Sequence, residues 1–278
     1  MLRTMLTATN TLTQLQTQLD TIGNNISNSS TQGYKTKDAK FSELLYQQFN
    51  NDKLDKTLRQ SPVGIRYGVG AYVSQILTNQ KQGSLQTTNR DLDLSFTTEN
   101  QYFNILMPEG DTTRTVYTRQ GNFYVTPLEN GQMMLVNGDG YPVANSEGEA
   151  IVFPDGVTRF TLTPEGQLNA QYEDGDVLNF NLGVTQLQKP QVLENLNGTY
   201  IGLPENLADL GYIEADIVTN LQGQARADIG MKYQVLEMSN VDLSKEMTNL
   251  ITTQRSYQFN SRAISIADQM LGLINGIR

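Results

Sequence analysis

The feature that most constrains this chain is a heptad repeat in its C-terminal stretch, Tyr233 to Arg278. From Leu243 onward the repeat positions alternate in steps of four and three, and they are mostly apolar with three polar breaks: Leu243, Met247, Leu250, Gln254, Tyr257, Ser261, Ile264, Asp268 and Leu271. No proline interrupts the stretch. Because a long helix with an apolar stripe needs a partner to cover it, the pattern predicts a C-terminal helix packed against another element.

The other end of the chain offers that partner. Its apolar residues follow the same alternation of three and four, at Met5, Ala8, Leu12, Leu15, Leu19, Ile22 and Ile26. One interpretation is a helical hairpin that closes a domain. The other is an assembly device, in which the two ends pair as a coiled coil and also meet the same helices of neighbouring subunits. The interface predicted for that device comprises Met5, Leu12, Leu15, Leu19, Ile22, Asn24, Asn25, Ile26, Met247, Leu250, Tyr257, Ile264 and Leu271.

The prolines divide the chain into proline-free ends and a punctuated middle. All eight lie between Pro62 and Pro204. A first helix is expected over Leu2 to Ile26, ended by a run of Asn, Ser and Thr that favours turns. A short helix over Phe41–Phe49 and a linker over Asn50–Gly70 should follow. The expected regions are 1–40 (assembly helix and signature), 41–70 (short helix and linker), 71–230 (β-rich domain) and 231–278 (C-terminal assembly helix).

Between residues 71 and 230 the period changes to two. Apolar residues alternate with polar ones around Leu94, Phe123, Phe160 and Phe180. Turn pairs recur at Asn130-Gly131, Asn137-Gly138, Glu147-Gly148, Asp155-Gly156, Glu165-Gly166, Asp174-Gly175 and Asn197-Gly198. This pattern predicts an antiparallel sandwich or irregular barrel, and the whole chain is expected to be α+β.

Composition narrows the chemistry. The chain contains no Cys, His or Trp, which excludes disulfides, thiolate or imidazole metal sites and His-based catalytic triads. Residues 41–230 carry eleven Lys or Arg against twenty-three Asp or Glu, so a nucleic-acid-binding face is not expected. No apolar run is long enough to span a membrane. The N-terminus lacks the pattern of a cleaved signal peptide, so we expect the protein to stay inside or to leave without one.

The remaining candidates for chemistry are carboxylate pairs and one glycine-rich turn. A glycosidase needs two carboxylates at a set separation, and the pairs close in sequence are Glu147/Glu149, Asp174/Asp176 and Asp91/Asp93. All lie in or beside turns or on an expected exposed strand face. The run Asn137–Gly140 resembles the start of a calcium loop, but no Glu closes it at EF-hand spacing. We therefore expect no enzymatic activity, no cofactor and no metal.

Several motifs, in order along nearly the whole chain, resemble the flagellar rod and hook proteins, the axial proteins of the bacterial flagellum. They are Asn24-Asn25-Ile26-Ser27-Asn28, Thr31-Gln32-Gly33-Tyr34-Lys35, Phe41-Ser42-Glu43-Leu44-Leu45-Tyr46, Gln82-Gly83-Ser84-Leu85, Tyr117 to Phe123, Ser239-Asn240-Val241-Asp242-Leu243, and Gln254 to Ser261. Within that family the chain is most similar to the distal-rod class (FlgG-like), and above all to the FlhP-type proteins of Gram-positive bacteria. Ser27 departs from the family's usual Ala, and the linker also differs, which leaves rod or hook-like placement open.

The resemblance implies a structural protein of the flagellar basal body. It would self-assemble into a helical tube between the export base and the hook, contact neighbouring rod and hook proteins, and leave the cytoplasm through the type III export apparatus. For Asn24, Asn25 and Asn28 the functional interpretation is a joint between the terminal helix and the rest, packed against neighbours in the shaft, while helix-end capping remains an equal interpretation. The alternatives from other classes are a cell-wall-associated carbohydrate-binding or hydrolytic protein, and another tubular secretion or phage-tail component.

Overall fold

The chain is analysed in a computed structural model that describes residues 2–43, 47–49, 65–68, 71–110, 112–207, 209 and 211–276. It divides into two compact units. Unit 1 comprises Met1–Ser27, Lys37–Leu77 and Asp242–Arg278, and unit 2 comprises Asn28–Thr36 and Thr78–Val241. Both ends of the chain therefore belong to unit 1, and the chain passes through unit 2 twice.

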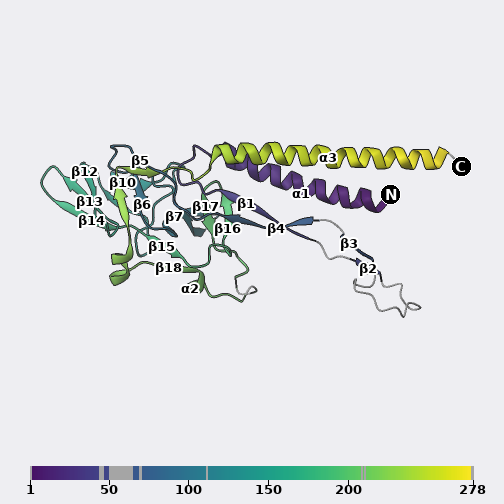
Figure 1. The fold of residues 1–278 in the computed structure, drawn as a ribbon. Coiled ribbons are helices and arrows are strands. Elements are labelled where there is room, and N and C mark those ends of the chain that lie inside the picture. The colour runs from purple at the N-terminus through teal and green to yellow at the C-terminus, as the bar shows by residue number, and fades with distance from the viewer. Residues whose placement is uncertain are drawn as a thin grey trace. The chain divides into compact units, whose positions relative to one another are not determined.

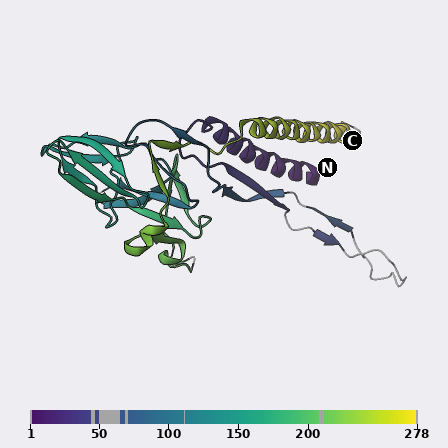
Figure 2. The same ribbon diagram turned by 60° about the vertical axis from the view of Figure 1, so that its left-hand side comes forward.

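Unit 1 is built around two long helices, as expected. Helix α1 spans Leu2–Ser27 and helix α3 spans Leu243–Gly276. They lie side by side and antiparallel, with both chain termini at the same end of the pair (Figures 1 and 2). At 1.5 Å per residue they are about 39 and 51 Å long. Supercoiling of the pair stays a prediction. No helix in the described part of the chain is long and apolar enough to cross a membrane.

The segment after the first signature is strand rather than helix. Strand β1 (Lys37–Glu43) pairs with β4 (Ala71–Thr78), and β2 (Gln47–Phe49) pairs with β3 (Ile65–Tyr67). The short helix expected over Phe41–Phe49 is therefore wrong at residues 41–43 and 47–49; residues 44–46 lie outside the described part. So does most of the expected linker. A short apolar run cannot be assigned by periodicity alone, and here pairing with a distant strand decides it.

Unit 2 is a set of antiparallel sheets; every register among its described strands is antiparallel. The largest sheet has the order β16-β17-β8-β7-β15-β18. Its strands are β7 (Gln101–Glu109), β8 (Thr112–Thr118), β15 (Val184–Leu187), β16 (Glu194–Asn197), β17 (Tyr200–Gly202) and β18 (Val218–Asn220). The β-rich middle is thus confirmed, whereas a sandwich or barrel closure stays a prediction.

Smaller sheets complete unit 2. Two are three-stranded, β11-β10-β9 and β12-β13-β14, and two are the pairs β19-β6 and β20-β5. Their bounds are β5 Leu85–Thr87, β6 Leu94–Phe96, β9 Tyr124–Pro127, β10 Gln132–Val136, β11 Val152–Pro154, β12 Val157–Leu162, β13 Gln167–Tyr172, β14 Val177–Asn181, β19 Met231–Tyr233 and β20 Val235–Glu237. Helix α2 (Glu214–Ile217) and the 3-10 helix η1 (Gly223–Asp228) are short. Strands β19 and β20 occupy residues expected in the C-terminal helical region.

The apolar core of unit 2 is centred on three aromatic rings in tilted and edge-to-face contact. Phe103 lies between Phe96, at 4.3 Å between ring centroids, and Phe123, at 4.9 Å, and all three side chains are fully buried. Phe160 and Phe180 pack against the same cluster. These aromatics therefore occupy the core positions that their alternation indicates. One detail differs: Ser95 is buried like its neighbours, so β6 is covered on both faces.

The expected turns are present with one correction. Positive φ angles occur at the glycines of six predicted turn pairs: Gly131, Gly148, Gly156, Gly166, Gly175 and Gly198. In the seventh, Gly140 takes the positive φ in place of Gly138. The reason is local: the Asn137 side-chain oxygen accepts hydrogen bonds from the backbone N–H groups of Asp139 and Tyr141, which places the positive-φ glycine two residues later.

Candidate assembly surface and a buried charge cluster

Helix α3 starts at the end of the Ser239–Leu243 motif. The Asp242 carboxylate accepts hydrogen bonds from the backbone N–H groups of Ser244 (3.0 Å) and Lys245 (3.1 Å). These are N–H groups that the first turn of a helix leaves without an intrahelical partner, so Asp242 is the N-cap. The start of the long helix is thus fixed by a single residue.

Asn25 joins three elements of unit 1 close to that start. Its side-chain N–H₂ donates to the carbonyl of Lys37 (2.9 Å) and to the Glu246 carboxylate (3.3 Å), and its oxygen accepts from the Lys37 N–H (3.0 Å). Asn25 is 1% exposed and Glu246 2% exposed. The structure thus places Asn25 in a joint between α1, β1 and α3 within one chain, whereas Asn24 is exposed.

The helices pack along a seam that differs in part from the expected one. On α1 the predicted positions face inward: Ile22 is buried, and Met5, Leu12, Leu15, Leu19 and Ile26 are half-buried. On α3 the half-buried predicted positions are Leu250, Tyr257, Ile264 and Leu271. Between them the covered residues are Glu246, Thr253, Asn260 and Ala267, whereas Leu243, Met247, Gln254, Ser261 and Asp268 are exposed.

The correction corresponds to a turn of α3 about its own axis by roughly 50°, half the angle of one residue. The Asn25–Glu246 hydrogen bond supplies a physical reason, because it holds the Glu246 side of α3 toward α1. The sequence pattern instead predicted the side of α3 that carries Met247, and this side remains uncovered. The covered seam is consequently rich in polar side chains.

Large apolar residues are exposed at intervals along α3, most of them away from the seam. Leu243, Met247 and Ile251 lie on its first turns, four residues apart and all more than two-fifths exposed. Farther along, Phe259, Ile266 and Leu273 recur every seven residues and are 76%, 54% and 69% exposed. Met270 and Ile274 are exposed beside them. We call these eight residues the α3 apolar surface. Apolar residues that gather on one element in this way mark an interaction site.

Unit 2 contains a second feature, a buried cluster of three charges. The Glu237 carboxylate receives the Lys35 ammonium at 2.6 Å and the Arg119 guanidinium through two nitrogens, at 2.8 and 2.9 Å. The Lys35 side chain is 5% exposed, and those of Arg119 and Glu237 are each 1% exposed. Remaining donors are satisfied too: Lys35 reaches the Lys81 carbonyl, and Arg119 reaches those of Thr98 and Gln101.

The surroundings lower the pKa of Glu237 and also the pKa of Lys35. Burial alone would raise the pKa of Glu237, but Arg119 and Lys35 outweigh burial, and the pKa lies below its ordinary value. Burial, together with Arg119, lowers the pKa of Lys35. The sequence motifs include Lys35 and Arg119, but sequence reasoning assigned them no role and missed Glu237. The signal available in the sequence was that both basic residues stand inside family motifs.

The carboxylate pairs considered from sequence are structural. Asp93 is buried in an ion pair with Arg90 at 3.2 Å, and Asp91 accepts a hydrogen bond from Gln234. Glu147 and Glu149 belong to a turn whose backbone N–H groups bond to Asn145, and Asp174 and Asp176 are exposed. Across the described residues, no three acidic groups gather closely enough to hold a metal ion.

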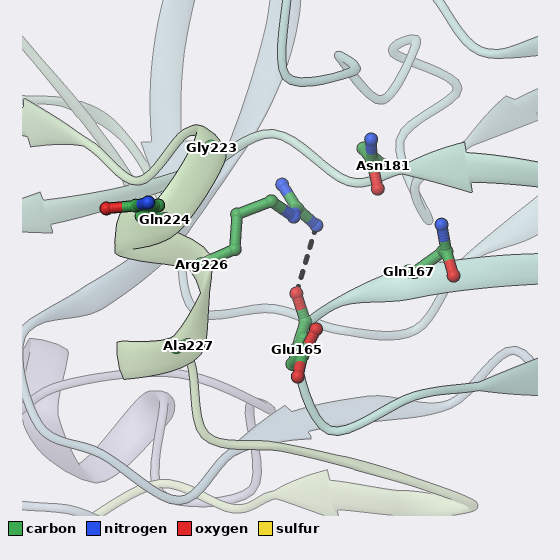
Figure 3. Close-up of a pocket in the computed structure, with 7 residues that line it drawn as sticks. All are labelled: Glu165, Gln167, Asn181, Gly223, Gln224, Arg226 and Ala227. Atoms are coloured by element: carbon green, nitrogen blue, oxygen red, sulfur yellow. Dashed lines mark hydrogen bonds between the residues drawn. The ribbon is translucent and has the colours of Figure 1, made fainter.

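A pocket of about 490 Å³ lies in unit 2 between η1 and strands β13 and β14 (Figure 3). Its lining includes Gln167, Asn181 and Arg226. Arg226 extends from η1 and donates to the carbonyls of Glu165 (3.0 Å), Gly166 (2.8 Å) and Leu182 (3.1 Å). Because the guanidinium is used to hold a turn, we assign it a structural role.

The chain matches known protein families along most of its length. Three family models fit: "Flagella basal body rod protein" at residues 5–35, "Flagellar hook protein FlgE/F/G D1 domain" at residues 98–170, and "Flagellar basal body rod FlgEFG protein C-terminal" at residues 234–277. The first and last cover the joint at Asn25 and the helix carrying the α3 apolar surface.

Curated relatives align over their full length. The flagellar hook-basal body complex protein FlhP of Bacillus subtilis is 45% identical, with all of both chains covered. The flagellar basal-body rod protein FlgG of Borreliella burgdorferi is 31% identical, over 100% of this chain and 99% of the relative. FlgG of Caulobacter vibrioides is 31% identical over 98% of each.

Proposed function

The chain belongs to the family of flagellar basal-body rod and hook proteins, and on that premise we propose that it is a rod component whose copies assemble into a helical tube between the export base and the hook. Membership of the family shows the general role, that of a structural protein of the flagellar basal body. Self-assembly and contact with neighbouring flagellar proteins go with that role.

The observation that carries the proposal is the α3 apolar surface. A helix with one side against α1 and another apolar side uncovered is suited to contact helices of further copies. Identical subunits that meet head to tail through such unlike surfaces form open helical assemblies instead of closed rings. We place the paired helices toward the axis of the tube and the acidic unit 2 toward its outside.

In this proposal the expected interface is divided by role. The half-buried residues of α1, together with Leu250, Tyr257, Ile264 and Leu271, hold the helix pair within a subunit. Met247 and the rest of the α3 apolar surface contact other subunits. Passage through the type III export apparatus, without a cleaved signal, completes the proposal.

The test replaces exposed residues of the α3 apolar surface by charge. Ile251→Asp and Ile266→Asp should leave the melting temperature of the isolated protein within about 2 °C of wild type, because neither side chain is buried in the subunit. In an assembly each copy would bury an unpaired carboxylate, which costs several kcal/mol per contact. Cells carrying either variant should therefore fail to complete flagella.

A matched control sits on the same helix. Gln258→Asp introduces the same charge at an exposed polar position, and it should permit assembly. Flagella built normally by both Ile→Asp variants would refute the assembly role of this surface. These positions are cleaner probes than Leu19 or Leu250, whose half-buried side chains also support the subunit's own helix pair.

A further inference from the structure

The charge cluster lies where the chain enters and leaves unit 2. The chain enters at Asn28, leaves after Thr36, returns at Thr78 and leaves finally after Val241. Lys35 belongs to the first passage. Glu237 lies just before the final exit, 202 residues after Lys35 and 118 after Arg119. Three segments that are remote in sequence therefore meet at one carboxylate.

Hydrogen bonds of the same residues tie these segments together. The backbone N–H of Gly33 donates to the Glu237 carbonyl (2.8 Å), and that of Gly83 donates to the Glu237 carboxylate (2.9 Å). Asn240 accepts from the Thr36 N–H (2.7 Å) and donates to the carbonyls of Asn79 (2.9 Å) and Lys81 (2.8 Å). Residues 237–240, which lie last along the chain, thus bridge the segment around residues 33–36 and the segment around residues 79–83.

Two glycines near the cluster lie in close contact with the backbone of neighbouring segments. A Cβ atom on Gly83 would lie 1.9 Å from the Met238 carbonyl oxygen, and one on Gly33 would lie 2.7 Å from the backbone of Arg119. Backbone therefore approaches backbone closely at Met238, next to Glu237, and at Arg119.

Electrostatics make Glu237 indispensable to the closed state. Among the described residues it is the only carboxylate within ion-pair distance of Lys35 or Arg119. Without it, closure would bury two unpaired cations. Removing one partner of a buried ion pair is strongly destabilising, because the other charge is left buried and uncompensated; we expect it to raise the open population by about a hundredfold or more.

We propose that the cluster is a closure checkpoint: unit 2 reaches its closed, protease-resistant state only when Glu237, near the C-terminal end, takes its place between Lys35 and Arg119. In residues 28–230 alone, Lys35 and Arg119 lack this carboxylate. The two unpaired cations then keep the sheets apart at this point. The checkpoint makes folding of the interposed β-rich unit conditional on the end of the chain. Combined with the proposed export, it would keep unit 2 open until the C-terminal part of the chain has joined it.

The test measures protease resistance of unit 2 in the full-length protein. Glu237→Gln keeps the shape of the side chain and removes its charge. We expect cleavage within unit 2 under native conditions to accelerate by about a hundredfold or more, since native-state cleavage follows the population of the open form. Glu129→Gln, the same change at an exposed position of unit 2, should leave the rate unchanged.

A triple variant separates the checkpoint from simple loss of packing. Replacing an entire buried ion cluster by apolar residues of similar size is often neutral, because no charge is left unpaired. Lys35→Met/Arg119→Met/Glu237→Met should therefore return the cleavage rate to within about tenfold of wild type, whereas Glu237→Met alone should be as open as Glu237→Gln.

Two results would overturn the proposal. Wild-type resistance in Glu237→Gln would show that closure does not need the charge. A triple variant as open as Glu237→Met would show that the cations are not what holds unit 2 open. Neither readout involves a flagellum, so failure here is distinguishable from failure of the assembly role, which the α3 variants test.

Discussion

At the scale of single residues, Asn25 shows how a side chain in a turn-rich signature acquires a long-range task. Asn near a helix end is ordinarily a cap or a turn former. Here its amide imitates a strand partner for Lys37 and also reaches a carboxylate on the other long helix. The joint between α1, β1 and α3 therefore depends on one side chain.

Asn25→Ala should lower the free energy of unfolding of unit 1 by about 2–3 kcal/mol. The variant leaves the Lys37 backbone and the Glu246 carboxylate buried without this partner, and unsatisfied buried groups cost about 1–3 kcal/mol. Urea unfolding followed by circular dichroism at the helix band measures the change. Asn10→Ala, at an exposed position of the same helix, is the control and should change stability by less than about 0.5 kcal/mol. Equal effects of the two substitutions would contradict the joint.

Two buried tyrosines predict how stability changes in alkali. Burial raises the pKa of Tyr102 and that of Tyr117 to about 12. In the unfolded chain both ionise near pH 10, while in the folded chain both stay neutral, so their contribution is intact below pH 10 and is lost as pH rises to about 12. We expect a loss of about 2 kcal/mol per tyrosine, measured by urea unfolding at pH 9 and pH 12. Tyr102→Phe should show a smaller loss than wild type; an identical loss would disprove the assignment.

At the scale of elements, α3 has more apolar surface than one neighbour can cover. The heptad positions at Leu250, Tyr257, Ile264 and Leu271 serve the pair with α1. Phe259, Ile266 and Leu273 form a separate row with the same seven-residue spacing. A helix with two such rows is suited to lie between partners, and the assembly role of its exposed positions stays a prediction.

The surroundings of two glycines predict opposite effects on stability when each is replaced by alanine. A Cβ on Gly121 would lie 1.8 Å from the Leu94 carbonyl oxygen, at the contact that joins β6 to the segment before β9. Gly121→Ala should therefore destabilise unit 2 by about 3 kcal/mol or more. Gly23 lies within α1 and has nothing within 4 Å of an added Cβ, so Gly23→Ala should stabilise the helix by about 0.5–1 kcal/mol. Chemical denaturation of both variants provides the measurement, and the same sign for both would contradict these contacts.

At the scale of the whole molecule, the two units differ in what stabilises them. Both buried apolar clusters of the described residues lie in unit 2. The helix pair of unit 1 is mostly half-buried and leaves the α3 apolar surface open. Burial of apolar area is the main favourable contribution to folding, so unit 1 should be the less stable of the two.

Heating the isolated protein should accordingly give two transitions. The helix band of circular dichroism should be lost first, and the near-ultraviolet signal of the buried tyrosines later. Gly121→Ala should lower only the second transition, and Asn25→Ala only the first. A single transition reported at the same temperature by both signals would show that the units unfold together.

The sequence by itself determined the class of elements and, through the lack of Cys and His, excluded disulfides and thiolate or imidazole chemistry. Heptad spacing at both ends and period-two patterning with turn pairs between them follow directly from helix and strand geometry, so α1, α3 and the β-rich middle were predictable. The family motifs were readable in a different way, through their resemblance to the flagellar rod and hook proteins. Local pattern could not determine the strands at 37–43 and 47–49, where pairing with distant residues overrides helical spacing.

Only the tertiary structure decided which faces are covered and which charges meet. The rotation of α3 is associated with one hydrogen bond between residues 25 and 246, which no periodicity encodes. The cluster of Lys35, Arg119 and Glu237 unites three segments that are remote in sequence, with Glu237 lying 202 residues after Lys35 and 118 after Arg119. Burial of a charge is favourable only where its partner arrives, and that arrival is a property of the folded chain.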